Sequence, residues 1–259
     1  MKTRSPSSTQ ALLLLAGLSL RRARRGRLLW LSAGVLALPV LAAGLALLSG
    51  QGGLGFYDKL LEALLCYLAP FIMAVNASAT VAEEVQGKTI TYLFSRPVAR
   101  WTLPVGKFAG NLLVNAVLLL FAVVLAYLLS MLGEGARDLA RELPRLGGGL
   151  LAMLLAAVFY ASVASAFGAM ATSYPFVATI LYVLVVEVGF AHVPGWFKVI
   201  AMTTHLRVVA GIYHPAQSMF LSDPRLSLAI SLPVVLGMSL LWLVVTIGWV
   251  GSTEYRTDR

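Results

Sequence analysis

Two adjacent carboxylates, Glu83 and Glu84, open the most polar stretch of an otherwise apolar chain. Three cations follow within that stretch: Lys88, Arg96 and Arg100. Paired carboxylates can serve as general acid and base, and a Gly-Lys-Thr sequence such as residues 87–89 can hold a phosphate. Residues 83–101 therefore invite three interpretations, which are nucleotide binding, proteolysis and contact with a protein partner.

The nucleotide interpretation fails on its surroundings. Residues 82–89 read Ala-Glu-Glu-Val-Gln-Gly-Lys-Thr, and Ala82 stands where a phosphate-binding P-loop requires its first glycine. A P-loop also follows a buried strand and opens a helix of a soluble α/β domain, whereas this stretch follows some twenty apolar and small residues. We therefore expect no nucleotide site, and no cofactor, in this chain.

The protease interpretation stays open as an alternative. Glu83 and Glu84 resemble the paired glutamates of intramembrane CAAX-type proteases, in which a carboxylate acts as general base. Those enzymes add an arginine to the pair and histidines in later spans, whereas the third element here is Lys88. The histidines at 192, 205 and 214 are expected at the opposite membrane face, which disfavours this chemistry.

Composition identifies a membrane protein. Of the 259 residues, 59% are hydrophobic and 12% charged, and the mean hydropathy is +0.85, whereas a soluble domain is about 25% charged. A helix needs about 20 apolar residues to cross a bilayer, and several runs in this chain approach or reach that length. They predict one all-α membrane domain, 1–259. Its expected spans are 28–48, 60–82, 106–132, 147–171, 176–191 and 228–250, with a loop at 83–105.

The net charge of +9 indicates lipid rather than nucleic acid. Seven of the 20 lysines and arginines precede Trp30, beside the first span, as is typical of a flank that faces anionic lipid. Within the tail 1–27, residues 11–20 are too short to span and predict a helix on the membrane surface. Its expected anchors are Arg21, Arg22, Arg24, Arg25 and Arg27.

The distribution of basic residues predicts the orientation. An even number of spans places both termini on one side, and thirteen of the 20 lysines and arginines fall in the termini or between residues 83 and 107. Cationic loops remain in the cytoplasm. We expect the termini and residues 83–105 to be cytoplasmic in a bacterial inner membrane.

The polar stretch and its context resemble the permease subunits of type 2 ATP-binding-cassette (ABC) transporters. The resemblance rests on a span that ends in Glu-Glu, a Gly-Thr-like element at 87–89, a Leu-Phe-Ser-Arg-Pro-Val-Ala-Arg-Trp sequence at 93–101, and Gly106-Lys107 at the next span. It extends over the six-span plan, the N-terminal surface helix and a re-entrant segment in the outer region 192–226. The chain departs from the family pattern at Lys88, between Gly87 and Thr89.

The resemblance implies an exporter's permease that forms the translocation path as a dimer with a second copy or close homologue. The chain itself would be no enzyme, because two separate ABC ATPase subunits would carry ATP and Mg. The coupling residues implied are Glu83, Glu84, Gly87, Thr89, Ser95, Arg96, Pro97, Arg100, Trp101 and Lys107. A membrane scaffold that is coupled to an ATPase but transports nothing remains a further alternative.

A few polar residues interrupt the spans. Glu187 is the one carboxylate well inside a span, and an ionisable group in lipid is a functional candidate. Asn76 and Asn111 are expected to form hydrogen bonds between helices, and with Glu187 they are candidates for the translocation path. Small residues in 161–169 predict close helix packing within the protomer. No metal site is predicted.

Overall fold

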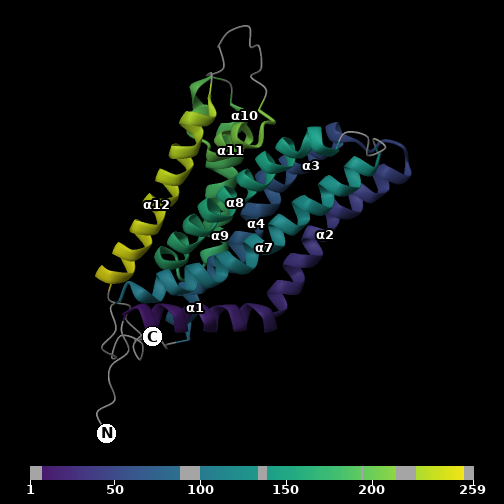
Figure 1. The fold of residues 1–259 in the computed structure, drawn as a ribbon. Coiled ribbons are helices and arrows are strands. Elements are labelled where there is room, and N and C mark those ends of the chain that lie inside the picture. Colours follow the sequence, from purple (N-terminus) through teal and green to yellow (C-terminus); the bar gives the residue numbers. More distant parts are fainter. Residues whose placement is uncertain (1–7, 88–99, 134–138, 194, 214–225, 254–259) are drawn as a thin grey trace.

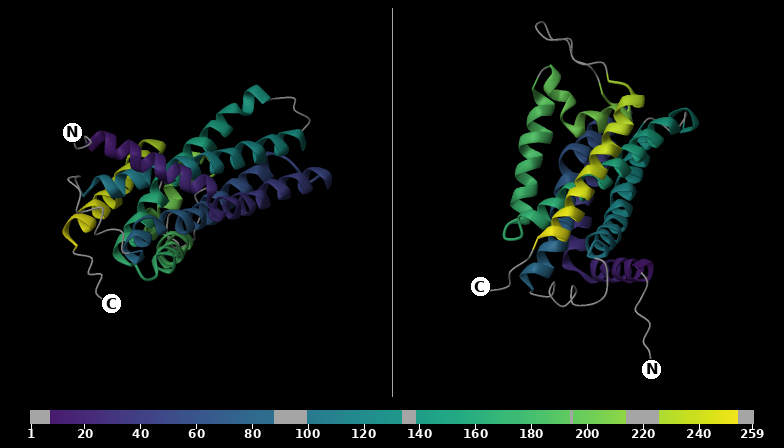
Figure 2. Two further views of the ribbon diagram at one scale, coloured as in Figure 1. Left: turned by 90° about the horizontal axis from the view of Figure 1, so that it is seen from below. Right: turned by 90° about the vertical axis from the view of Figure 1, so that its left-hand side faces the viewer.

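The protein is an all-helical bundle. The computed structural model describes residues 8–87, 100–133, 139–193, 195–213 and 226–253, so the predicted coupling residues Thr89, Ser95, Arg96 and Pro97 lie outside it. Helix α1 (Ser8–Arg25) lies across the end of the bundle where α12 ends, and α10 and α11 lie at the opposite end (Figure 1). We call these the α1 end and the α11 end; Figure 2 shows both from two further sides.

Six segments are long and apolar enough to cross a membrane, which confirms the predicted six-span, all-α fold. Four are single helices: α2 (Arg27–Leu48), α7 (Thr102–Gly133), α8 (Leu139–Met170) and α12 (Leu228–Ser252). The second comprises α3 (Leu54–Ala63), η1 (Leu64–Leu68), α4 (Ala69–Ala77) and α5 (Ala79–Gln86). The fifth comprises α9 (Pro175–Tyr182), η2 (Val183–Gly189) and α10 (Phe190–His192).

Between the fifth and sixth spans lie two short helices, η3 (Trp196–Val199) and α11 (Met202–Ala210). Helix α11 is buried along most of its length, from Met202 to Leu206 and at Val209 and Ala210. It packs against α8 and α12. Short helices in this region agree with the sequence prediction, and a re-entrant path through the membrane surface stays a prediction.

Two glycines seat α1 on α7. A Cβ atom on Gly106 would lie 2.8 Å from the Cβ of Leu15, and one on Gly110 would lie 2.6 Å from the carbonyl oxygen of Ala16. Small residues four apart let helices approach closely. The four-residue spacing of Gly106 and Gly110 is visible in the sequence and could have predicted this contact. The contact holds the predicted surface helix against the third span.

The second span begins at Leu54, six residues before the predicted start. The predicted span, 60–82, left out residues 54–59 with the charged Asp58 and already contained Glu62. In the fold, Asp58 forms an ion pair with Arg145 of α8. Glu62 lies 2.9 Å from Arg207 of α11. Paired charges cost far less to embed than isolated ones, so the helix extends through both positions.

The triple glycine 147–149 was predicted to break the chain before the fourth span, and instead it lies inside the continuous helix α8. A Cβ on Gly149 would collide with the Tyr57 hydroxyl, and one on Gly148 would lie 3.3 Å from the carbonyl oxygens of Val209 and Ala210. Gly148 and Gly149 therefore provide a packing surface for α11 and α3.

Helix α8 is the centre of the bundle and the most buried of the candidate spans. It packs against α4, α7, α11 and α12, and Met153, Phe159 and Tyr160 are almost completely buried along it. Near its end, a Cβ on Gly168 would collide with the carbonyl oxygen of Ser78, between α4 and α5. The small residues of 161–169 thus serve contacts within the protomer.

Candidate functional site

The two glutamates lie on a helix, not in a loop after it. Helix α5 continues the second span to Gln86, and the N–H of Gly87 donates to the carbonyl oxygen of Glu83 at 2.8 Å. The third span begins at Thr102 rather than 106. Pro104 lies in the first turn of α7, where a proline fits because that N–H has no helical partner.

An ion pair joins the two spans that flank residues 88–99. Lys107 Nζ of α7 contacts Glu84 Oε1 of α5, and the two side chains are only 11% and 17% exposed. This pair joins the end of the second span to the start of the third.

Two further contacts anchor the chain on either side of residues 88–99. Gln86 Nε2 donates to the carbonyl oxygen of Thr172 at 2.6 Å, in the turn between α8 and α9. Arg100 Nη1 donates to the carbonyl oxygen of Gly251 at 3.2 Å, near the end of α12. Both ends of this segment therefore contact parts of the bundle distant in sequence. Trp101 beside them is 41% exposed.

A ladder of amides runs inward from this end. Asn76 Nδ2 of α4 donates to Ser32 Oγ of α2 at 2.8 Å and to Asn115 Oδ1 of α7 at 2.9 Å. Asn115 Nδ2 in turn donates to Asn111 Oδ1 at 2.7 Å. The predicted bond between helices is confirmed for Asn76, whereas Asn111 accepts its bonds from Asn115 on its own helix, α7. The ladder joins the first three spans.

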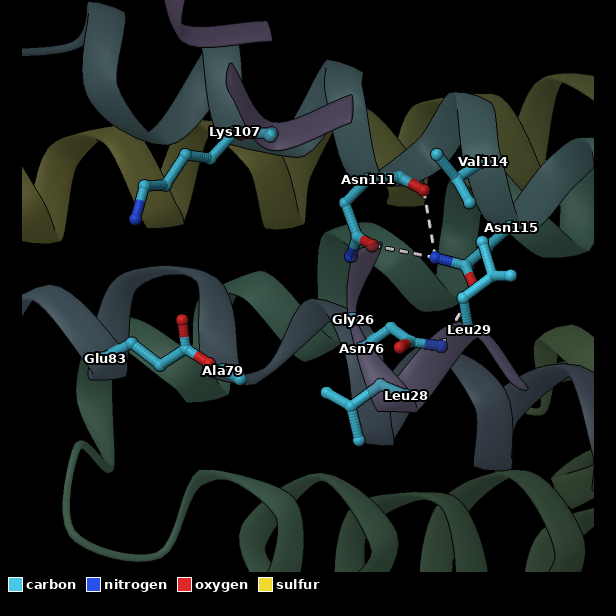
Figure 3. Close-up of a pocket in the computed structure, with 11 residues that line it drawn as sticks. Gly26, Leu28, Leu29, Asn76, Ala79, Glu83, Lys107, Asn111, Val114 and Asn115 are labelled. Carbon is cyan, nitrogen blue, oxygen red and sulfur yellow. Dashed lines mark hydrogen bonds between the residues drawn. The ribbon is translucent and has the colours of Figure 1, made fainter. Parts of the chain in front are cut away.

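The ladder borders a cavity of about 130 Å³ at the α1 end (Figure 3). Charged walls come from Glu83 of α5 and Lys107 of α7, and Asn76 and Asn111 lie deeper. Apolar and small residues complete the lining: Ser19, Gly26, Leu28, Leu29, Ala79, Val114 and Asn115. Two coupling candidates, Glu83 and Lys107, thus lie in one polar space with two path candidates of the amide ladder, Asn76 and Asn111, and the corner between α1 and α2 forms one wall.

Glu187 lies in a separate network at the α11 end. It is fully buried on the π-helical turn η2. Tyr182 Oη donates to its Oε1 at 3.1 Å, and the N–H and hydroxyl of Thr203 donate to its Oε2 at 2.9 and 3.1 Å. Tyr160 completes the network at 2.9 Å from the Thr203 hydroxyl. The carboxylate therefore fastens η2 to α11 and does not meet Asn76 or Asn111.

Sequence reasoning missed a second anchor of α11. Arg207 Nη2 pairs with Glu62 and also donates to the Cys66 sulfur at 3.2 Å. Cys66, expected to pack as a small apolar residue, is buried and contacts a cation. Together with Glu187, this cluster connects α11 to both spans that carry a π-helical turn.

The predicted lipid anchors lie where α1 turns into α2. Arg21, near the end of α1, and Arg27, the first residue of α2, are both exposed. Arg22, Arg24 and Arg25 lie in the last turns of α1. Leu13, Leu14 and Leu18 are more than half exposed along the same helix. Exposed leucines followed by arginines suit a helix at the membrane surface.

The histidines do not support proteolysis at Glu83. His192 and His205 belong to α10 and α11, at the end of the bundle opposite α1 (Figure 1), and His214 lies outside the described residues. Among the residues that the structure describes, no three His, Cys, Asp or Glu side chains are grouped to hold a metal ion. The described histidines therefore lie at the wrong end of the bundle to act with Glu83, and Glu84 forms an ion pair with a neighbouring span.

His205 is a buried, neutral part of α11. Its Nε2 lies 2.9 Å from the carbonyl oxygen of Val199 and its Nδ1 lies 3.1 Å from Ser231 Oγ of α12. Burial lowers the pKa of His205 below its usual value, and the bond to Val199 opposes that shift. An imidazole that resists protonation makes the α11 end sensitive to acid.

Acidification is expected to destabilise the protein through His205. Below about pH 6.5 the unfolded chain binds a proton at this position that the folded chain does not, so unfolding becomes more favourable as the pH falls. The loss is at most about 1.4 kcal/mol per pH unit. Unfolding temperatures measured in detergent from pH 7.5 to 5 should fall less in His205→Gln than in wild type.

His192→Gln is the matched control for that measurement. His192 is exposed, so its replacement should leave the acid-dependent loss of stability as it is in wild type. Equal losses in wild type and His205→Gln would show that the acid sensitivity resides elsewhere.

Comparison with known proteins identifies the family. A family model described as ABC-2 family transporter protein matches residues 20–189, well over half of the 259 residues. The match begins in α1, includes the first four spans and the segment between α5 and α7, and ends with η2. No curated protein matches the sequence. With six candidate spans and this match, the chain belongs to the ABC-2 family of transporter proteins, as a membrane-spanning permease subunit.

Proposed function

We propose that this permease works as an exporter, forms its path together with a second copy, and is driven by separate ATPase subunits that bind residues 83–101. The observation that carries the coupling proposal is the Glu84–Lys107 ion pair. It holds the end of α5 against the start of α7, on either side of residues 88–99. A displacement of residues 88–99 would therefore move the second and third spans together.

The contacts around this base extend the coupling to the rest of the bundle. Gln86 contacts the turn before α9, and Arg100 contacts the end of α12. Gly168 of α8 packs directly against Ser78, so the centre of the bundle contacts the joint between α4 and α5. An ATPase that binds two permease states differently shifts their populations through such contacts.

A second copy has apolar faces on which to pack. Large side chains are exposed along α2, at Leu38, Leu41 and Leu45, and along the fifth span, at Val177, Leu181 and Leu184. Such faces can meet lipid or another helix. The dimer and the outward direction of transport follow from the resemblance to type 2 permeases.

Replacing residues 88–99 by a glycine–serine linker of equal length tests ATPase recruitment. The variant should lose copurification with a protein that carries a complete P-loop, identified by mass spectrometry, while its unfolding temperature stays near wild type. The same replacement at 214–225, also twelve residues long, should keep the ATPase. If both variants retain it, residues 83–101 are not the docking element.

Export is tested in inside-out membrane vesicles. With ATP, they should accumulate a compound from an isotopically labelled cell extract, and vesicles with the 88–99 linker should not. ATP hydrolysis without accumulation of any compound would instead support a scaffold that is coupled to an ATPase but transports nothing.

A further inference from the structure

The cavity at the α1 end contains a hydrogen-bond donor for which the protein provides no acceptor. Asn111 is 8% exposed, and its Oδ1 accepts a bond from Asn115. Within the part of the chain that the structure describes, its Nδ2 has no hydrogen-bond partner. Figure 3 shows this amide extending from α7 toward the space that Asn76 borders. A buried N–H without an acceptor is costly, which indicates that a molecule in the cavity supplies one.

The size and the polar walls of the cavity suit water. Its volume of about 130 Å³ equals roughly four waters at ~30 Å³ each. Amides of Asn76, Asn111 and Asn115 lie on its wall, and a water held there gives the Asn111 donor its acceptor, which a hydrocarbon chain would not. Glu83 and Lys107 also line the cavity, but both already have partners. The amides therefore decide what the cavity holds.

The cavity brings polar surface well into the bundle. Asn111 lies nine residues beyond the start of α7, which is about 14 Å along a helix axis. The border of the cavity reaches the protein surface at Leu28, which is 42% exposed. Behind Asn111 the amide ladder continues through Asn115 and Asn76 to Ser32. Polar groups thus run from the α1 end, the predicted cytoplasmic side, to the space between α2, α4 and α7.

We propose that this cavity is a hydrated inlet, open to the cytoplasm, through which the polar part of the substrate enters between the first three spans. A substrate that enters here carries an oxygen acceptor, such as a hydroxyl, carbonyl or phosphate oxygen, because the group that the protein leaves unused is a donor. That acceptor displaces the water on Asn111. The hydration of the cavity does not depend on the export proposal, whereas its role as the substrate inlet rests on it.

Labelling of single cysteines measures whether water reaches Asn111 from the cytoplasm. Cys66 is the only cysteine of the chain, so Cys66→Ser provides a background without thiols. A charged, membrane-impermeant methanethiosulfonate reacts with the thiolate, which apolar surroundings suppress. In inside-out vesicles without ATP, Asn111→Cys should react at least about tenfold faster than cysteines at positions of α7 outside the cavity. In right-side-out vesicles it should not react, and labelling from that side alone would overturn entry from the cytoplasm.

Val117 and Leu119 are the matched control positions on α7. Val117 is 59% exposed on a spanning helix, where lipid or another helix covers it, and Leu119 is fully buried in the core. Cysteine at either position should therefore stay unlabelled. Val114 also lines the cavity, so Val114→Cys should react as Asn111→Cys does and takes its place if that variant fails to fold. Labelling of the cavity positions no faster than Val117→Cys overturns the hydrated inlet.

A transport assay with the same variants tests the role of the inlet. Labelled Asn111→Cys should lose the ATP-driven accumulation that the unlabelled variant shows in inside-out vesicles, because the attached group fills the cavity. Arg21 is exposed and outside the cavity, so Arg21→Cys should be labelled and still accumulate. Accumulation that labelling at Asn111 leaves unchanged overturns the inlet. If no unlabelled vesicles accumulate any compound, export fails and the substrate role with it, while the labelling rates still decide whether the cavity is hydrated.

Discussion

Replacing Gly168 by alanine should lower the unfolding temperature by about 10 °C. The added Cβ would collide with the carbonyl oxygen of Ser78 and would lie 3.0 Å from its carbonyl carbon and 3.3 Å from its Cα. All three are backbone atoms, so no side chain can rotate away, and α8 must separate from the joint between α4 and α5. Overpacking of this kind costs about 3 kcal/mol, or roughly 10 °C for a chain of this size. Thermal unfolding of the purified permease in detergent measures it.

Gly237→Ala is the matched control for Gly168→Ala. Gly237 also lies inside a spanning helix, α12, but a Cβ there would meet nothing within 4 Å. Its unfolding temperature should stay within about 2 °C of wild type, because alanine fits an open helical position at least as well as glycine. If Gly168→Ala behaves like Gly237→Ala, the two helices do not approach as closely as the structure indicates.

The architecture could be predicted from sequence because a bilayer imposes a simple length rule. Runs of about twenty apolar residues are sufficient to identify a span, and all six appeared as expected. The polar residues 83–101 could be singled out for the same reason, since charge is rare in such a chain. Their resemblance to type 2 permeases then predicted the family that the match over residues 20–189 confirms.

Predictions failed where a residue depends on a partner far away in the sequence. The predicted second span left out Asp58, and its partner Arg145 lies 87 positions later; Glu62 was inside the predicted span, but its partner Arg207, 145 positions later, was not foreseen. A single sequence does not indicate which distant residues will form such ion pairs. The prediction that the fourth span begins at the triple glycine 147–149 was wrong for a related reason. Whether a glycine ends a helix or packs against another helix depends on its neighbours in space.

The site was predicted as a list of residues and not as an arrangement. Lys107 was named as a coupling residue, but its pairing with Glu84 was not foreseen. The amide ladder was expected in outline, whereas its exact bonds depend on where α2, α4 and α7 place their side chains. Glu187 was named for the translocation path, which stays a prediction, and its bonds to Tyr182 and Thr203 were not foreseen.

Breaking the Glu84–Lys107 pair should cost about 3 kcal/mol of unfolding free energy. Both side chains are mostly buried, so Lys107→Gln removes a charged partner from the buried Glu84, and Glu84→Gln does the same to Lys107. The double variant should lose less than the sum of the single losses, because neither charge then remains. The exchanged pair, Glu84→Lys with Lys107→Glu, should recover much of the lost stability. Additive losses would mean that the two groups do not interact.

The same pair should matter to coupling as well as to stability, and the Asp58–Arg145 pair separates the two effects. Both pairs join spanning helices, but Asp58 lies in α3 at the start of the second span, whereas Glu84 lies in α5 at its end. Arg145→Gln should destabilise the permease, by less than Lys107→Gln because its side chains are 33% and 24% exposed, and leave stimulation of the ATPase intact. Lys107→Gln should lose both, since α5 and α7 then move independently when the ATPase moves the segment between them. ATP hydrolysis rates with and without each reconstituted permease measure this, and equal stimulation by the two variants would reduce the Glu84–Lys107 pair to a packing contact.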